Sequence, residues 1–287
     1  MSSHPSRRAV VAGTAALGAL AAPLAAAADQ AATPAMQAVL DYVGGQKTTG
    51  FLVVRDRRTV VERNWPAPAG DASFRNFAYE TTPDGALLED VASQQKSFVS
   101  VLAAVAADRG LLDVARPVSA YVGAGWSKAA PDQEAKIRVI DVLTMSSGLT
   151  EGFGYAAPPG AVFLYNTPVY AITKRILAAA AKLPLETITH DWLTAPAGMS
   201  ETSWRKRPAA FADVGNPTGL VTSPRDTARL GQIALDGGKA AGGARIVSEA
   251  GMKAMFARSA TNPAYGRFWW LNGSAFRNAS DSAPTAP

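Results

Sequence analysis

Residues 93–110 read SQQKSFVSVLAAVAADRG, and this stretch governs the fold. Apolar side chains from Phe98 to Val105 recur at the i, i+3, i+4, i+7 spacing of one helical face. Gly110 follows as a natural helix stop. The pattern predicts a buried helix that begins near residue 93.

The first turn of this helix carries Ser93 and Lys96 on one face, three residues apart. Free backbone N–H groups and the positive end of the helix dipole favour a developing anion there. The pair therefore indicates a serine nucleophile with a base partner, and the alternative is an ordinary serine near a helix start. Ser203 and Lys206 repeat the spacing, but no apolar helical repeat follows Pro208, so we expect no chemistry from that second pair.

The composition excludes several classes of protein. The chain has 287 residues, 48% of them hydrophobic and 18% charged, which predicts a globular protein. Because there is no cysteine, disulfides, thiolate nucleophiles and iron–sulfur clusters are excluded. The only histidines are His4 and His190, and we expect His190 on a helix surface. We therefore expect no cofactor, no metal site and a base other than histidine.

The formal net charge of +5 is only mildly basic. The densest basic cluster, residues 205–207, precedes Pro208 and has no interleaved aromatic side chains. This pattern favours a solvated loop over a nucleic-acid surface, so we expect no nucleic-acid partner.

Residues 1–28 have the pattern of a secretory signal peptide. Arg7 and Arg8 precede a small, apolar run, and residues 25–28 are alanines suited to cleavage. We predict an exported bacterial protein, periplasmic or extracellular, with no stable membrane anchor. The arginine pair favours the twin-arginine route, and a general secretory leader and a retained anchor are the alternatives.

Along the mature chain, short β-branched runs at 50–55 and 59–63 predict a hairpin. Aromatic residues at 265–272 predict another strand, and the Ser, Ala and Pro content of 274–287 predicts a disordered tail. We expect an α+β domain over 29–273 whose antiparallel sheet is completed by both ends of the chain. Further helices are expected at about 138–146, 168–182, 185–195, 224–236 and 248–257.

Over residues 48–272 the chain resembles the serine β-lactamase and penicillin-binding-protein superfamily. Within its class C-like branch, the 6-aminohexanoate-dimer (nylon oligomer) hydrolase group is the most similar. The resemblance rests on seven motifs that occur in the family's order: GFLVVRD, SQQKS, VLTMSSGL, F-x-Y before a helix, GMSETSW, NPTGLVTSPRDTARLG and YGRFWWLNG.

The resemblance implies a β-lactamase/transpeptidase-like fold and three catalytic residues. Ser93 would be the nucleophile, Lys96 its base partner and Tyr165 the proton shuttle. The family's third motif position holds Thr167 here, with Asn166 beside it, so Asn166 is expected as a substrate contact. The implied function is a serine hydrolase that acts on small amide, ester or peptide substrates through an acyl-enzyme.

Such a site requires a shifted pKa. Lysine titrates near 10.4 and tyrosine near 10 in water, so one of them must shift by roughly 3 units to act as a base at neutral pH. Burial lowers the pKa of a lysine, and a neighbouring ammonium lowers that of a phenol. Placing Lys96 and Tyr165 beside one hydroxyl would achieve the shift.

The family continues beyond its Trp-Trp strand into further sheet strands, which this chain lacks, so we expect a domain with its last strands missing. A catalytically silent relative that binds cell-wall peptides or a partner is therefore the alternative function. A glycosidase with paired carboxylates is a remote third class, since no spaced acidic pair stands out. The sequence carries no signal for the oligomeric state.

Overall fold

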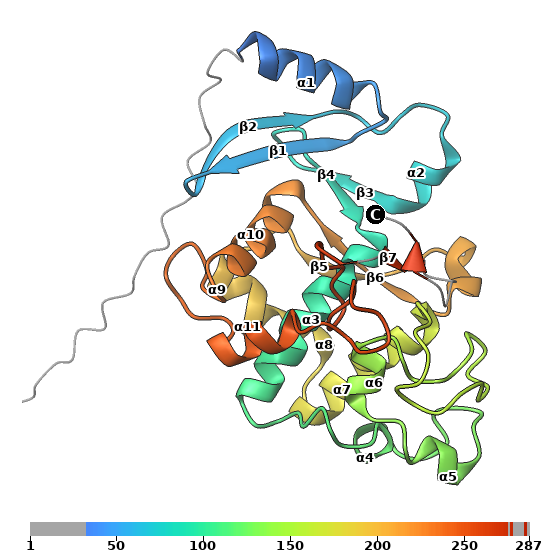
Figure 1. The fold of residues 1–287 in the computed structure, drawn as a ribbon. Coiled ribbons are helices and arrows are strands. Elements are labelled where there is room, and N and C mark those ends of the chain that lie inside the picture. The colour runs from blue at the N-terminus through green and yellow to red at the C-terminus, as the bar shows by residue number, and fades with distance from the viewer. Residues whose placement is uncertain (1–32, 275, 278–283, 286–287) are drawn as a thin grey trace, which may run out of the picture.

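A computed structural model describes residues 33–274, 276–277 and 284–285 (Figure 1). The predicted signal peptide, residues 1–28, lies outside these described residues. Within them, none of the helices combines the length and apolarity needed to cross a bilayer.

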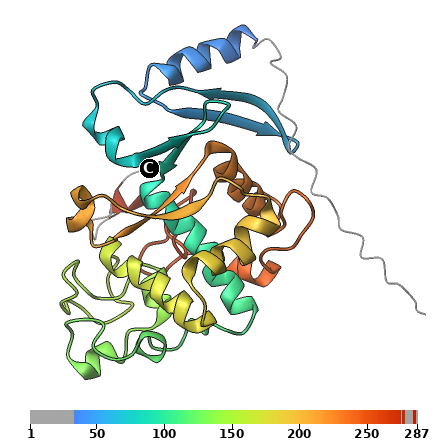
Figure 2. The same cartoon turned by 180° about the vertical axis from the view of Figure 1, so that it is seen from behind.

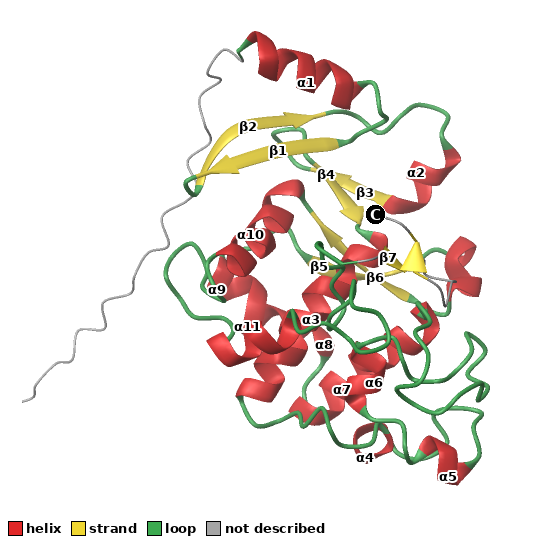
Figure 3. Cartoon of the chain, in the orientation of Figure 1, coloured by secondary structure: helices red, strands yellow, loops and turns green. Residues whose placement is uncertain are grey.

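In the described chain, strands β1–β4 come before α3, and most of the helices lie between β4 and β5 (Figure 3). The helices are α1 (Pro34–Gly44), α2 (Ala72–Phe77), η1 (Ala92–Gln94), α3 (Gln95–Asp108), α4 (Ser119–Val122), α5 (Pro131–Glu134), α6 (Val139–Leu143), α7 (Thr167–Ala181), α8 (Leu185–Thr189), η2 (His190–Thr194), α9 (Ala195–Ala197), η3 (Ala209–Val214), α10 (Pro224–Leu235) and α11 (Glu249–Met255). The strands are β1 (Gly50–Arg55), β2 (Arg58–Asn64), β3 (Ala78–Thr81), β4 (Leu87–Asp90), β5 (Ser203–Lys206), β6 (Thr218–Thr222), β7 (Phe276–Arg277) and β8 (Pro284–Thr285).

The predicted hairpin is present as β1 and β2, which pair antiparallel from Gly50 opposite Asn64 to Arg55 opposite Arg58. The turn residues Asp56 and Arg57 both have positive φ, as tight hairpin turns of this kind require. Among the described residues this hairpin forms a two-stranded sheet of its own. The expectation that both ends of the chain complete the main sheet is therefore wrong for the described part of the chain.

The main sheet has four antiparallel strands in the order β3-β4-β6-β5. These strands were not predicted from the sequence, because each has only four or five residues and a long, mostly helical segment separates β4 from β5. The chain leaves the sheet at the end of β4, makes the short turn η1 and enters α3 directly. The predicted nucleophile therefore lies where a sheet strand passes into the central helix.

Helix α3 is the core of the molecule, as its apolar pattern predicts. Phe98, Leu102 and Ala106 are fully inaccessible to solvent, and each fully buried large apolar side chain contributes about 1.5–3 kcal/mol to folding. Helices α7 and α11 pack against α3. Viewed from behind, α7 crosses beside α3, and α1 lies on the far side of the first hairpin from both of them (Figure 2).

The predicted strand at 265–272 is not formed. This segment is a tight loop in which Tyr265 and Trp270 make an isolated bridge and Phe268 has a φ of 62°. The side chains of Tyr265 and Phe268 are buried, and the Phe268 ring meets that of Tyr170 edge-on at 5.1 Å. Burial of rings on several sides outweighs the extended preference of the aromatic residues.

The region predicted to be a disordered tail is described only at residues 274, 276–277 and 284–285. There β7 pairs antiparallel with β8 over two residues each. The rest of that prediction falls on residues outside the described chain.

Candidate active site

The turn between β4 and α3 presents Ser93. Ala92, just before it, has a φ of 46°, an uncommon conformation for a residue with a Cβ atom. The Ala92 N–H donates to Asp90 Oδ1 at 2.9 Å, and the Gln94 N–H donates to the Val91 carbonyl at 2.9 Å. Ser93 is exposed at the tip of this turn, so an incoming substrate can reach its hydroxyl.

Lys96 lies one helical turn after Ser93, and its Nζ is 3.1 Å from Ser93 Oγ. The lysine is only 2% exposed. Burial, aided by the positive charge of Arg207, lowers the pKa of Lys96 to about 8. Thus a substantial fraction of Lys96 is a neutral amine near physiological pH, and it lies within reach of the serine proton.

Tyr165 comes from the loop that precedes α7, and its ring centroid is 4.7 Å from Lys96 Nζ. Burial raises the pKa of Tyr165, although a hydrogen bond with Ser93 opposes the shift. The ring stacks on Trp270 with centroids 5.8 Å apart. The structure thus brings Ser93, Lys96 and Tyr165 together, and Tyr165 is a neutral phenol that can donate a proton.

Asn166, the residue after Tyr165, uses its side chain to hold the start of α7. Its Oδ1 accepts the Val169 N–H at 3.0 Å, which caps α7, and its Nδ2 donates to the Leu149 carbonyl at 2.9 Å. Both polar ends of the buried side chain are therefore engaged within the fold. A substrate contact by Asn166 stays a prediction, whereas Thr167 Oγ1 is 3.4 Å from Lys96 Nζ and reaches the site directly.

Sequence reasoning did not single out Tyr170 as part of this environment. Its ring lies 4.7 Å from Lys96 Nζ on another side from Tyr165, and its hydroxyl donates to Gln95 Oε1 at 3.2 Å. Burial raises its pKa well above the usual value. Because Tyr170 occupies an apolar helix position, its sequence pattern resembles that of any core aromatic residue.

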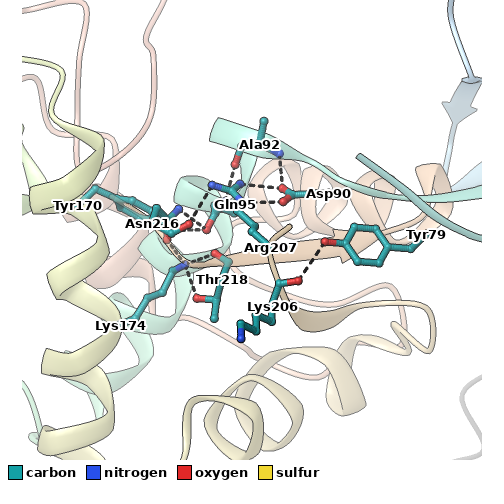
Figure 4. Close-up of polar contacts among 10 residues, drawn as sticks. All are labelled: Tyr79, Asp90, Ala92, Gln95, Tyr170, Lys174, Lys206, Arg207, Asn216 and Thr218. Carbon is teal, nitrogen blue, oxygen red and sulfur yellow. Dashed lines mark hydrogen bonds and ion pairs between the residues drawn. The ribbon is translucent and has the colours of Figure 1, made fainter. Parts of the chain in front are cut away.

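The prediction of a solvated loop over residues 205–207 is wrong, because Arg205 and Lys206 belong to strand β5 and Arg207 is buried. Arg205 and Lys206 are exposed, but the side chain of Arg207 is only 5% exposed and forms a two-pronged ion pair with Asp90 at 2.7 and 2.9 Å (Figure 4). A local basic run gives no signal of a carboxylate 117 residues earlier, so only the fold reveals this pair.

Metal ligation has no support among the residues that the structure covers: no group of three or more His, Asp or Glu side chains could hold an ion there. His190, expected at a helix surface, is indeed exposed beside Asp191.

An antiparallel sheet, a buried helix behind it and a serine at the start of that helix define a β-lactamase/transpeptidase-like fold. The chain belongs to the Beta-lactamase family, whose sequence profile matches residues 26–277. No curated protein sequence shows a significant match.

Solved structures with the same fold span most of the chain. A protein from Bacteroides dorei DSM 17855 assigned as a beta-lactamase is 16% identical, with a TM-score of 0.63 over 82% of this chain and 77% of that one. A protein from Bacillus anthracis assigned as a 6-aminohexanoate-dimer hydrolase is 18% identical, with a TM-score of 0.59 over 81% and 67%. A beta-lactamase/D-alanine carboxypeptidase from Yersinia pestis is 18% identical, with a TM-score of 0.51 over 72% and 70%.

Proposed function

We propose that this protein is a serine hydrolase that cleaves amide or ester bonds of small substrates through an acyl-enzyme on Ser93. One observation carries the proposal: a buried lysine with a lowered pKa lies 3.1 Å from an exposed serine hydroxyl. Membership of the Beta-lactamase family and structural likeness to hydrolases support it.

In the first step the neutral Lys96 amine takes the proton of Ser93, whose Oγ attacks the substrate carbonyl carbon. With a pKa of about 8, about one Lys96 in ten is neutral at pH 7, against fewer than one in a thousand for a solvated lysine. The backbone N–H of Ser93 donates to the developing oxyanion, which removes part of its charge cost. The lowered pKa of Lys96 is thus what makes the serine a nucleophile.

In the second step the bond between the carbonyl carbon and the leaving nitrogen or oxygen breaks, and the leaving group takes a proton. The Tyr165 phenol is protonated at neutral pH because burial raises its pKa, so it is the donor, and Lys96 restores its proton. Water then attacks the acyl-enzyme with the same groups acting in reverse and releases the acid.

The substrate contact expected of Asn166 belongs to this proposal in a modified form. Because both polar ends of Asn166 hold the start of α7, it would act by placing Tyr165 and Thr167 beside the substrate. Export also belongs to the proposal, on the leader sequence 1–28 alone. N-terminal sequencing of the secreted protein should find a start near Asp29, and a cytoplasmic chain that retains Met1 would contradict export.

A fluorophosphonate tests the proposed nucleophile. Intact-mass analysis should show one adduct on the wild type, one adduct on Ser203→Ala and none on Ser93→Ala. Ser203→Ala is the matched control, because Ser203 has the same spacing to a lysine but lies on the exposed strand β5. A wild type that takes no label would favour the silent, peptide-binding alternative, and an adduct that survives Ser93→Ala would overturn the assignment.

A further inference from the structure

The residue before the nucleophile is held at both of its backbone polar groups. The Ala92 N–H donates to Asp90 Oδ1 at 2.9 Å, and the Ala92 carbonyl accepts from Gln95 Nε2 at 2.7 Å. A positive φ is strained at alanine and persists only where the surroundings enforce it. These two hydrogen bonds enforce it, and they give the turn its shape (Figure 4).

Gln95 is itself held by a buried chain of hydrogen bonds. Its Oε1 accepts from Asn216 Nδ2 at 3.2 Å, and Asn216 Oδ1 accepts from Lys174 Nζ at 2.7 Å. The chain therefore runs from α7 through the segment before β6 to the first turn of α3, and it ends at the Ala92 carbonyl (Figure 4).

Lys174 is an unusual member of this hydrogen-bond chain, because it is only 7% exposed and none of its bonds to the described residues reaches a carboxylate. Its remaining N–H groups donate to the Thr218 carbonyl at 2.7 Å and Thr218 Oγ1 at 3.0 Å, and its Nζ lies 4.5 Å from the Trp204 ring centroid. A buried lysine costs free energy that an apolar side chain at the same place would not. The position thus uses its three N–H donors to join α7 to β6 and to the turn.

A second arm meets the first at Asn216. Arg207 holds both oxygens of Asp90, and its Nη1 donates to the Asn216 carbonyl at 3.3 Å. Asp90 in turn accepts the Ala92 N–H. The two arms make a closed loop of bonds around the residue that precedes Ser93.

We propose that Lys174 is a positioning residue: through Asn216 and Gln95 it keeps Ala92 in its left-handed conformation and so holds the Ser93 hydroxyl within reach of Lys96. This inference rests on the proposed function. Lys174 is about 80 residues from the S-x-x-K motif, and its Nζ bonds to Asn216 and Thr218 rather than to Ser93, so its effect is on the geometry of acylation.

The groups that surround Lys174 also affect its charge. Burial and the charges of Arg207 and Lys96 lower its pKa to about 7, while Asp90 opposes the shift. Both the charged and the neutral amine keep an N–H donor for Asn216. The link to Asn216 therefore stays available across neutral pH, while the neutral amine has one donor fewer for the two Thr218 oxygens.

Lys174→Met is the test variant, because methionine keeps the flexible apolar stem and removes the three donors. Arg175→Met is the matched control, since Arg175 is the next residue of α7 and is exposed. Gln95→Met removes the last link of the same chain.

The first readout is the acylation rate for a p-nitrophenyl ester, expressed per active site titrated with a fluorophosphonate. We expect a fall of about 10- to 100-fold in kcat for Lys174→Met and Gln95→Met, with KM changed less than about twofold, and wild-type values for Arg175→Met. The double variant should fall no further than the worse single variant, because both changes break one chain.

The second readout does not need activity. Hydrogen exchange by mass spectrometry should show at least tenfold faster exchange over residues 92–94 in Lys174→Met than in the wild type, with the middle of α3 unchanged. Unchanged exchange at 92–94 contradicts the positioning role whether or not the protein is active. Faster exchange with a wild-type rate per titrated site contradicts it too, and a purely structural lysine would give that result. Failure of the proposed function is separate, because the wild type itself would then take no label.

Discussion

Two segments of this protein share the S-x-x-K spacing and differ in everything else. Ser93 and Lys96 begin a buried helix, and Lys96 Nζ lies 3.1 Å from Ser93 Oγ. Ser203 and Lys206 lie on strand β5, where both side chains are exposed. In a strand, residues three apart point to opposite faces, so the second pair cannot meet.

The S-x-x-K spacing alone therefore does not make a serine nucleophilic. A helical backbone brings positions i and i+3 together, and burial then removes water from the amine and lowers its pKa. Lys96 has both conditions, and burial brings its pKa to about 8.

The largest loss of activity is expected from replacing Lys96, and Lys206 serves as its control. Lys96→Met should lower kcat/KM by about 10³-fold, because general-base catalysis typically supplies 10²–10⁴-fold. Lys206→Met should leave it unchanged, because Lys206 is exposed on β5. Steady-state kinetics with a p-nitrophenyl ester would measure both, and equal losses would show that the helix context is irrelevant.

Next come two tyrosines, one near each segment. Tyr165→Phe should lower kcat by about 10²-fold, since it removes the phenol proton beside Lys96. Tyr79 donates to the Lys206 carbonyl at 3.4 Å, so Tyr79→Phe is the matched control and should keep the wild-type rate. Single-turnover acylation rates give the comparison, and a wild-type rate in Tyr165→Phe would remove Tyr165 from the mechanism.

The pH dependence of kcat/KM should report the titration of Lys96. Because the base must be neutral, kcat/KM should rise about tenfold per pH unit below a pKa of about 8 and level off above it. In Lys96→Met this limb should disappear. A profile that is flat between pH 6 and 9 in the wild type would show that Lys96 is not the titrating base.

The smallest effect concerns stability near the site. Asn166→Ala removes the cap of α7 and leaves the Leu149 carbonyl without its donor, so unfolding free energy should fall by about 2 kcal/mol. Ser203→Ala, on the exposed strand, should change it by less than about 0.5 kcal/mol. Urea titrations measure both, and a fully stable Asn166→Ala that loses activity would instead favour a direct substrate contact.

The sequence was informative wherever a local pattern decides the structure. The apolar repeat after Ser93 predicts α3, and the helix expected at about 224–236 is present as α10, whose cap is formed by the Ser223 hydroxyl and the Asp226 N–H. The β-branched runs predict the first hairpin. These features depend on residues within one or two turns of each other, so they are readable without the rest of the molecule.

Other structural features could not be predicted from the sequence, because they depend on contacts with residues far along the chain. The aromatic run at 265–272 has the composition of a strand, yet ring packing against Tyr170 bends it into a loop. Arg207 belongs to a basic run, yet Asp90 draws it into the interior. Short strands such as β4 and β6 form because each pairs with two neighbouring strands, β4 with β3 and β6, and β6 with β4 and β5.

The sequence by itself therefore determined the central helix, the order of the motifs and the identity of Ser93, Lys96 and Tyr165 as candidates. Only the tertiary structure decided that these three meet and that the pKa of Lys96 falls to about 8. It also decided that Lys174, on α7, bonds to Asn216 in the hydrogen-bond chain that leads to the turn before Ser93. The physical reason is that helical periodicity is a property of neighbouring residues, whereas desolvation and hydrogen bonding in the interior depend on groups that the fold brings from far along the chain.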